Sequence, residues 1–477
     1  MEQIVTMGLS HMKHIDIKKL IKSKAAGNVI ILTVSIALIY SLISVYFCNH
    51  FFFNTEINGV NVSLKAYGTA EHVIKDYIKD YELQLTERNR KAEKITAEEM
   101  DLQYNGKIGI SGIYHLQNSF KWISSLFKGQ NYDIHGLYSY NKDLLKNKID
   151  HLNCFNGTAI EPQNVNFRYS NGSYQVIEEV PGNIIIKDEL DEAIEKSIEK
   201  GETNLDLEEK HCYKNPKYTL DSYKTHITEN LLNKYISADI TYQFGSESEN
   251  EKLNGDAINK WLDVDGDLNI VINRTAIMKY VNGLSEKYDT VGTTRNFKTS
   301  TGKTIAVKGG LYGWKIDQGA ETEALFENIT HGKIISKEPI YAQKALSRGE
   351  DEIGNTYLEI NITRQHVWFY MDGKPIADGA VVTGNPNRGW STVTGIYMLN
   401  YKQKGAILRG PGYKTDVTYW MPFYGNIGLH DASWRYSFGG EIYKSNGTHG
   451  CINAPFYLAK TIFENIKEGT PIVCYQE

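Results

Sequence analysis

A long stretch without charge near the start of the chain restricts the fold more than any other feature. Within residues 25–53, His50 is the only side chain that can carry a charge near neutral pH. The apolar centre, residues 29–48, has 20 residues, and a helix needs about 20 apolar residues to cross the hydrocarbon of a bilayer. A buried helix of a soluble domain is the alternative, but such helices seldom run this far without a charge. The sequence therefore predicts a single transmembrane helix within residues 25–53.

The flanks of this stretch predict its orientation. A cleaved signal peptide is the alternative to a retained anchor, but the polar lead of 24 residues is long and no Ala-x-Ala-like site follows. Positive residues beside a membrane span stay on the cytoplasmic side. We therefore expect residues 1–24 to be a cytoplasmic tail and residues 54–477 to lie outside the cell membrane. The positive residues are Lys13, Lys18, Lys19, Lys22 and Lys24.

The composition is that of folded protein and argues against some partners. Of the 477 residues, 41% are hydrophobic and 23% charged, close to the usual globular mixture. The net charge of -5 argues against nucleic acid as a partner. The five cysteines include no Cys-x-x-Cys, so neither a disulfide framework nor the usual zinc signature is present. Cys154 and Cys212 would pair only if the fold brought them together, and Cys48 and Cys474 lie in apolar surroundings.

A weak internal repeat indicates two related α+β modules. Two segments share the pattern Asn-Phe-Arg/Lys-x-Ser-x-Gly, beginning at Asn166 and Asn296, an offset of 130 residues. Upstream, two apolar trios at i, i+4 and i+7 predict one buried helical face in each module. We expect a leading segment and first module over residues 54–215 and a second module over 216–346. The trios are Leu145, Ile149 and Leu152, and Ile277, Val281 and Leu284.

The pattern changes after residue 346. Residues 347–354 are polar with glycine near both ends and predict a linker. Residues 357–362 then alternate in the manner of a half-buried strand, and Asp372-Gly373 is a turn signal between further strand-like runs. We therefore expect residues 355–477 to form a compact β-rich domain.

The segment around Cys451 carries the chemistry. A thiol becomes a strong nucleophile when a neighbouring imidazole takes its proton, and His430 and His449 are the candidates. Gly447 and Gly450 allow the tight backbone that an oxyanion hole of N–H groups requires. A zinc site of His430, His449 and Cys451 is the alternative, but a glycine-rich loop at the cysteine suits acyl chemistry better.

These residues resemble the signature of the L,D-transpeptidase catalytic domain. That family has a histidine, a gap of about the size seen here, and then Ser/Thr-His-Gly-Cys, a hydrophobic residue and Asn or Arg. The similarity extends over about residues 355–475, and the two upstream modules resemble, more weakly, the wall-associated repeats of Gram-positive enzymes. The motifs that carry the resemblance are His430-Asp431-Ala432-Ser433-Trp434, Thr448-His449-Gly450-Cys451-Ile452-Asn453, Val382-Thr383-Gly384-Asn385-Pro386 and Tyr419-Trp420-Met421-Pro422-Phe423.

The resemblance implies a role for each residue of the site. Cys451 is expected to be the nucleophile, His430 the general base, and His449 a second histidine that orients the base or binds substrate. Backbone N–H groups near Gly450 and Cys451 are expected to form the oxyanion hole. The expected substrate-binding residues are Thr448, Asn453, Tyr419, Trp420 and Trp434, although for the three aromatics a place in the core is an equal alternative.

The implied function is cross-linking of peptidoglycan. The expected enzyme forms a thioester with one stem peptide, releases D-Ala and passes the acyl group to an amine of a second stem, a 3→3 cross-link without metal or cofactor. An L,D-carboxypeptidase and a non-catalytic wall-binding protein remain alternatives, and the modules are either spacers or glycan-binding units. Papain-like enzymes need a histidine after the cysteine, and sortases need an arginine there. Residues 452–477 contain neither.

Overall fold

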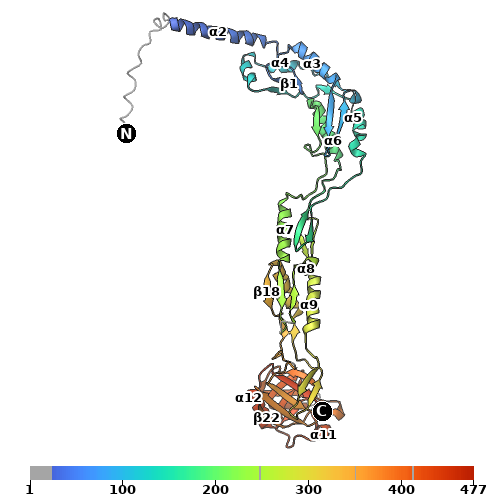
Figure 1. The fold of residues 1–477 in the computed structure, drawn as a ribbon, viewed down its shortest axis with the longest axis vertical. Coiled ribbons are helices and arrows are strands. Elements are labelled where there is room, and N and C mark those ends of the chain that lie inside the picture. The colour runs from blue at the N-terminus through green and yellow to red at the C-terminus, as the bar shows by residue number, and fades with distance from the viewer. Residues whose placement is uncertain (1–23, 246–248, 350, 411–412) are drawn as a thin grey trace, which may run out of the picture. The chain divides into compact units, whose positions relative to one another are not determined.

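The computed structural model describes residues 24–245, 249–349, 351–410 and 413–477 (Figure 1). The chain divides into two compact units. Unit 1 runs through Val165 and includes Glu178–Thr219, whereas unit 2 consists of Asn166–Ile177 and Leu220–Glu477. The predicted cytoplasmic tail lies outside the described residues, apart from Lys24.

The uncharged stretch begins as one long helix, α2 (Lys24–Tyr46). Its part Gly27–Tyr46 is long and apolar enough to cross a membrane by length and composition, and its apolar side chains are exposed. The helix ends before the predicted segment does, because Phe51 and Phe52 are buried in unit 1. Residues 47–53 therefore belong to the folded module rather than to the helix.

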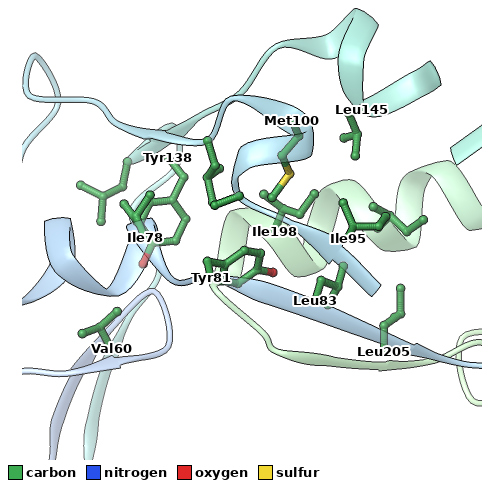
Figure 2. Packing of buried hydrophobic residues seen from close by; sticks show 14 of the residues in the cluster. Val60, Ile78, Tyr81, Leu83, Ile95, Met100, Tyr138, Leu145, Ile198 and Leu205 are labelled. Atoms are coloured by element: carbon green, nitrogen blue, oxygen red, sulfur yellow. The ribbon is translucent and has the colours of Figure 1, made fainter. Parts of the chain in front are cut away.

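Unit 1 is built around a core to which helices and strands both contribute (Figure 2). The helix α3 buries Ile74 and Ile78, and the strand β3 buries Leu83 and Leu85 at alternate positions. The elements are α2 (Lys24–Tyr46), β1 (Thr55–Ile57), β2 (Val60–Asn61), α3 (Tyr67–Lys79), β3 (Glu82–Thr86), β4 (Ala92–Thr96), η1 (Glu98–Met100), β5 (Gln103–Tyr104), α4 (Ser111–Leu116), η2 (Ser119–Leu126), β6 (Gln130–Tyr132), β7 (Tyr138–Ser139), α5 (Lys142–Asp150), η3 (Asn153–Phe155), α6 (Lys187–Lys200) and β10 (Asn204–Asp206).

The first part of unit 2 is a second module of mixed helix and strand. Its sheet has the order β12-β11-β18, and the predicted apolar face of residues 277–284 is buried along α9. The elements are β8 (Asn166–Ser170), β9 (Ser173–Ile177), α7 (Tyr223–Ile236), β11 (Asp239–Tyr242), β12 (Glu251–Leu253), α8 (Gly255–Ile258), η5 (Asn259–Trp261), β13 (Leu262–Val264), β14 (Ile270–Ile272), α9 (Arg274–Tyr288), β15 (Arg295–Lys298), β16 (Thr304–Val307), β17 (Lys315–Ile316), α10 (Gln318–Thr330), β18 (Ile334–Lys337) and β19 (Tyr341–Gln343).

The two hairpins that carry the sequence repeat each pack against the part of the chain that follows. The β8–β9 hairpin packs on α7, where the Asn233 side chain accepts from the backbone N–H of Tyr174 at 2.8 Å and donates to its carbonyl at 3.3 Å. The β15–β16 hairpin packs on the C-terminal domain, where Phe297 contacts the ring of Tyr357. The repeated sequence pattern therefore marks hairpins that pack against the following part of the chain, rather than the middle of a module.

The C-terminal domain consists of two sheets that share one core with α12. The strand orders are β22-β21-β20-β28-β23 and β24-β25-β26-β27. The mixed architecture agrees with the expected fold class, in which a strand-rich domain follows α+β modules. The elements are β20 (Tyr357–Asn361), β21 (His366–Met371), β22 (Lys374–Ala380), η6 (Pro386–Arg388), β23 (Gly395–Met398), β24 (Gln403–Gly410), β25 (Tyr413–Tyr424), β26 (Ile427–Asp431), α11 (Ile442–Asn446), β27 (Ile452–Ala454), α12 (Phe456–Asn465) and β28 (Pro471–Tyr475).

The first strand of this domain differs from the expected half-buried strand. Both faces of β20 are covered, so that Glu359 and Asn361 are fully buried. The Glu359 carboxylate accepts hydrogen bonds from the backbone N–H and hydroxyl of Ser300 in the β15–β16 turn, at 3.0 and 2.5 Å, and from the Tyr475 hydroxyl at 2.6 Å. The predicted linker is also packed, because Ile353 is buried.

Replacing Glu359 with alanine is expected to loosen this junction. The change leaves the Ser300 N–H and the Tyr475 hydroxyl without their acceptor, which costs about 2–4 kcal/mol. Hydrogen exchange across β20 of the intact chain measures the loss as faster exchange. The matched control is Glu464→Ala, a glutamate with an exposed side chain, for which a change below about 0.5 kcal/mol is expected. Equal effects from the two variants would contradict the role of Glu359.

Candidate active site

Two neighbouring strands bring the predicted cysteine and histidine together. His430 lies on β26, which runs parallel to β27 with His430 opposite Asn453. Cys451 directly precedes β27, and its Sγ atom lies 3.4 Å from the carbonyl oxygen of Asn426 just before β26. Cys451 and His430, 21 positions apart in the chain, are thus brought together by this strand pair, and both line one pocket of about 210 Å³.

That pocket collects most of the predicted residues and several others. The lining comes from β24, β25, β26 and the segment after it, and from the loop that leads into β27. The lining residues are Leu408, Thr415, His430, Trp434, Arg435, Gly447, Thr448, His449, Cys451 and Asn453.

Hydrogen bonding assigns the proton of the His430 ring. The Nδ1 atom lies 2.9 Å from the carbonyl oxygen of Asp431. A carbonyl only accepts, so Nδ1 carries the hydrogen in the neutral ring and Nε2 is left as the acceptor. The Asp431 carboxylate is engaged elsewhere, accepting from the backbone N–H groups of Thr418 and Tyr419 at 2.8 and 2.7 Å. The ring is therefore oriented by a backbone carbonyl.

Burial keeps both reacting groups neutral in the resting site. It raises the pKa of the Cys451 thiol to about 11. It also lowers the pKa of the His430 imidazole below its ordinary value of 6.5, against the opposing effects of the bond to the Asp431 carbonyl and of the Asp431 charge. At neutral pH the site thus holds a thiol beside a neutral imidazole, the combination that general-base catalysis requires.

The loop before Cys451 is held by the hydroxyl of Thr448. This hydroxyl donates to the carbonyl of Cys451 at 2.6 Å and accepts from the N–H of Gly450 at 3.0 Å. Thr392 adds a second tie, donating to the carbonyl of Gly450 at 2.7 Å. Thr448 thus shapes the loop, and the Gly450 N–H, which was expected to join the oxyanion hole, is already bonded within it.

Two glycines of the site are required by geometry. Gly450 has φ of +117°, a conformation that side chains with a Cβ rarely adopt. A Cβ on Gly384, in the segment that pairs with Thr448, would lie 1.9 Å from the carbonyl oxygen of Trp390. Gly450 therefore contributes the shape of the loop rather than a free N–H donor.

The predicted aromatic residues separate into two groups. Trp434 is exposed and lines the pocket, and its ring centroid lies 6.0 Å from that of His430. Tyr419 is buried among Phe456 and Phe463 in the domain core, and Trp420 is buried behind His430. The sequence left two interpretations open for these aromatic residues, a place in the substrate groove and a place in the core. For Tyr419 and Trp420 the structure favours the core.

His449 lines the pocket, whereas the bond that orients His430 goes to the carbonyl of Asp431. It is exposed, and its ring stacks on Trp390 with centroids 3.9 Å apart. Because a backbone carbonyl already orients His430, the structure favours substrate contact over orientation of the base for His449. Asn453 of β27 is buried and is one of the residues that line the pocket.

Sequence reasoning missed Arg435, Leu408 and Thr415. Arg435 lines the pocket, and its Nε atom is buried without a hydrogen-bond partner. Its place five residues after His430 was the available signal. Leu408 and Thr415 come from a hairpin that no motif marks.

In the described part of the chain, no cluster of three or more His, Cys, Asp and Glu side chains suits a metal ion, so the zinc alternative gains no support.

Comparisons with known proteins agree with this site. The family model described as "L,D-transpeptidase catalytic domain" matches residues 355–474, and the model described as "Putative peptidoglycan binding domain" matches residues 93–206 and 220–335. No curated protein matches the chain.

Solved structures of transpeptidases resemble parts of the chain. A cysteine-to-serine mutant of an Enterococcus faecium L,D-transpeptidase is 30% identical, covering 52% of this chain and 98% of that one, with a TM-score of 0.42. The catalytic domain of an E. faecium L,D-transpeptidase is 35% identical over 25% of this chain and 97% of that one, with a TM-score of 0.24. An L,D-transpeptidase from Mycobacterium tuberculosis is 19% identical over 25% of this chain and 57% of that one, with a TM-score of 0.23.

The two-sheet domain and the matched family model define the protein as a transpeptidase. The chain belongs to the L,D-transpeptidase family, and two domains of the peptidoglycan-binding type precede its catalytic domain.

Proposed function

We propose that the protein is a membrane-anchored L,D-transpeptidase that forms 3→3 cross-links in peptidoglycan outside the cell membrane. The observation that carries the proposal is one pocket lined by a thiol, Cys451, and an imidazole, His430, whose free Nε2 acts as base. The exposed apolar helix α2 supports the anchor, and the basic residues before it support the outward orientation. The modules are proposed to contact the wall, as the name of the matched family suggests.

The first half-reaction forms the acyl-enzyme. His430 Nε2 takes the proton of the Cys451 thiol, and the sulfur attacks the carbonyl between the third residue and the fourth residue, D-Ala, of a stem peptide. The oxyanion is proposed to be stabilised by backbone N–H groups near Cys451. When the C–N bond breaks, the protonated His430 gives its proton to the leaving amine of D-Ala, and a thioester remains.

The second half-reaction transfers the acyl group. An amine of a second stem attacks the thioester carbonyl, His430 takes a proton from this amine, and the sulfur leaves and regains that proton. Transfer must outcompete water at ~55 M, which requires a held acceptor, and positioning contributes on the order of 7–11 kcal/mol at best. The exposed rings of Trp434 and His449 line the pocket and are proposed to hold the acceptor, and Trp390 stacks on His449.

Muropeptide analysis tests the reaction. The full chain in detergent micelles is incubated with tetrapeptide-stem substrate, with and without a free D-amino acid, and the products are weighed by mass spectrometry. Dimers lacking one D-Ala, and exchange of the terminal residue for the added amino acid, are expected. Tripeptide as the only product, unchanged by added amine, would make the protein an L,D-carboxypeptidase. No product at all would favour a non-catalytic wall-binding protein.

The resting protonation state predicts a pH dependence. Acylation is expected to need neutral His430, whose lowered pKa places the acid limb of kcat/KM below pH 6.5. Because the thiol pKa is about 11, iodoacetamide should alkylate Cys451 about tenfold faster per pH unit between about pH 7 and pH 10. An alkylation rate independent of pH between about pH 6 and pH 8 would instead reveal a preformed thiolate–imidazolium pair.

Arg435 is proposed to bind the carboxylate of the terminal D-Ala. Arg435 lines the pocket, and its buried Nε–H has no acceptor within the protein. Arg435→Gln is expected to raise KM about 10- to 100-fold, the value of a hydrogen bond to a charged group, with a smaller effect on kcat. The control is a stem with an amidated terminus, which the wild type and the variant should bind equally. An equal loss for acid and amide would contradict this role.

A further inference from the structure

A second surface of unit 1 has the properties of a membrane contact. Residues 102–132 contain no aspartate or glutamate but include Lys107, Lys121 and Lys128. Within this stretch, α4 and η2 form a short helical segment, residues 111–128, in which apolar side chains are frequent. In a chain with 57 acidic residues, such an interval concentrates positive charge and apolar surface in one place.

This segment packs against the end of the apolar helix (Figure 1). The Tyr40 hydroxyl of α2 donates to the carbonyl of Phe120 in η2. The Trp122 ring lies 5.8 Å from that of Tyr40 and 6.1 Å from that of Phe47. The Gln117 amide donates to the carbonyl of Phe47 at 3.1 Å. Residues 111–128 are therefore attached to the last turns of α2.

The depth of the attachment matches the edge of a bilayer. Tyr40 stands six residues before the helix end at Tyr46, which corresponds to about 9 Å at about 1.5 Å per residue. The hydrocarbon core is about 30 Å thick and the interfacial regions add several ångströms on each side. If α2 spans the membrane, a segment attached at Tyr40 thus reaches about 9 Å below the outer end of the span, within the roughly 5–10 Å to which interfacial helices bury their apolar faces.

The outward face of the segment is apolar and has no cover in the described part of the chain. Phe120 and Phe127 are 64% and 88% exposed, comparable with Leu38 of α2 at 60%. In water such a cluster of large apolar side chains is unfavourable and marks a contact surface. The other exposed apolar side chains here are Leu116, Ile123 and Leu126.

We propose that residues 111–128 are a membrane foot, which inserts its apolar side chains into the outer leaflet beside α2 and places its lysines among anionic lipid headgroups. This inference rests on the proposed membrane anchor. Lipid is favoured over a protein partner because the foot continues the apolar surface of α2 and carries lysines without any carboxylate. Two attachments, a span and a foot, restrain the tilt of the first module relative to the membrane.

Photo-crosslinking tests the foot. The full chain is placed in nanodiscs of phosphatidylcholine and phosphatidylglycerol with p-benzoylphenylalanine at position 38, 127 or 436, and lipid adducts are counted by mass spectrometry after irradiation. The probe at position 38 reports on the span, and the probe at position 127 reports on the foot. The probe at position 436 measures random encounters with lipid, because Tyr436 is 100% exposed in the catalytic domain. Adducts at positions 38 and 127, each at least about tenfold above position 436, are expected for groups held in the bilayer.

The outcomes separate the two proposals. Adducts at position 38 with position 127 no better than 436 would overturn the foot and leave the anchor. Adducts at neither would overturn both, and adducts at 127 alone would reject the span and with it a foot that inserts beside α2. A protein adduct at 127 in irradiated cells, in place of lipid, would assign the surface to a protein partner. Lys121→Glu with Lys128→Glu should lower the yield at 127 several-fold, and an unchanged yield would contradict the headgroup contact.

Discussion

Replacing Cys451 with alanine is expected to abolish both half-reactions. Without the sulfur no thioester forms, and no other group in the pocket is a nucleophile of comparable strength. Loss of a nucleophile that acts as a unit with its base costs at least ~10⁴-fold in kcat. Intact-protein mass spectrometry should show no acyl-enzyme, and muropeptide analysis should show no dimer.

The other cysteines serve as matched controls. Cys154→Ala, Cys212→Ala and Cys474→Ala should retain the chemistry, because these thiols lie outside the pocket. Cys154 and Cys212 pack in the core of unit 1 and do not share the pocket of His430, so neither has this base to deprotonate it. Turnover of stem peptide by the Cys451 variant would disprove the mechanism, and inhibition by EDTA rather than by a thiol alkylator would favour the zinc alternative.

Replacing His430 with alanine is expected to lower kcat by on the order of 10²–10⁴-fold. That is the range for loss of a positioned acid–base group, and with a thiol pKa of about 11 very little thiolate exists at neutral pH without the base. The loss should shrink as pH rises toward the thiol pKa, because hydroxide then performs the deprotonation. Single-turnover acylation, followed by mass spectrometry across pH, measures both effects.

The neighbouring histidine is the control for this result. His449→Ala removes an exposed ring that stacks on Trp390, and an effect below about tenfold in kcat is expected, because the Asp431 carbonyl orients His430. If His449→Ala and His430→Ala lost activity equally and with the same pH dependence, the assignment of the base would have to be revised.

The family was accessible from the sequence because its signature lies in one continuous stretch. Thr448, Gly450 and Cys451 act through a single loop, and the spacing to His430 is set by the strand pair that brings the two together. The resemblance is confirmed by the family model over residues 355–474. The roles of the individual residues stay predictions until the variants are measured.

Other parts of the site were not accessible in this way. Tyr419 and Trp420 stand beside each other in a motif, yet both are buried, and only the packing of β25 shows this. Arg435 was overlooked although it follows His430 by five residues, because that spacing alone does not show that a side chain lines the pocket. The Gly450 N–H, which was expected to join the oxyanion hole, donates to the hydroxyl of Thr448. The orientation of that hydroxyl cannot be predicted from the spacing of residues in the sequence.

The sequence by itself determined the features that depend on local composition and period: the uncharged helix, the buried helical face at residues 277–284, and the Cys451 motif. Tertiary structure alone decided which faces are covered. The strand β20 alternates like a half-buried strand, but a hairpin from the preceding module covers its second face and binds Glu359. The physical reason is that the burial of a surface depends on which distant segment packs on it. That contact does not change the alternating sequence pattern of the strand that is covered, so the pattern cannot predict it.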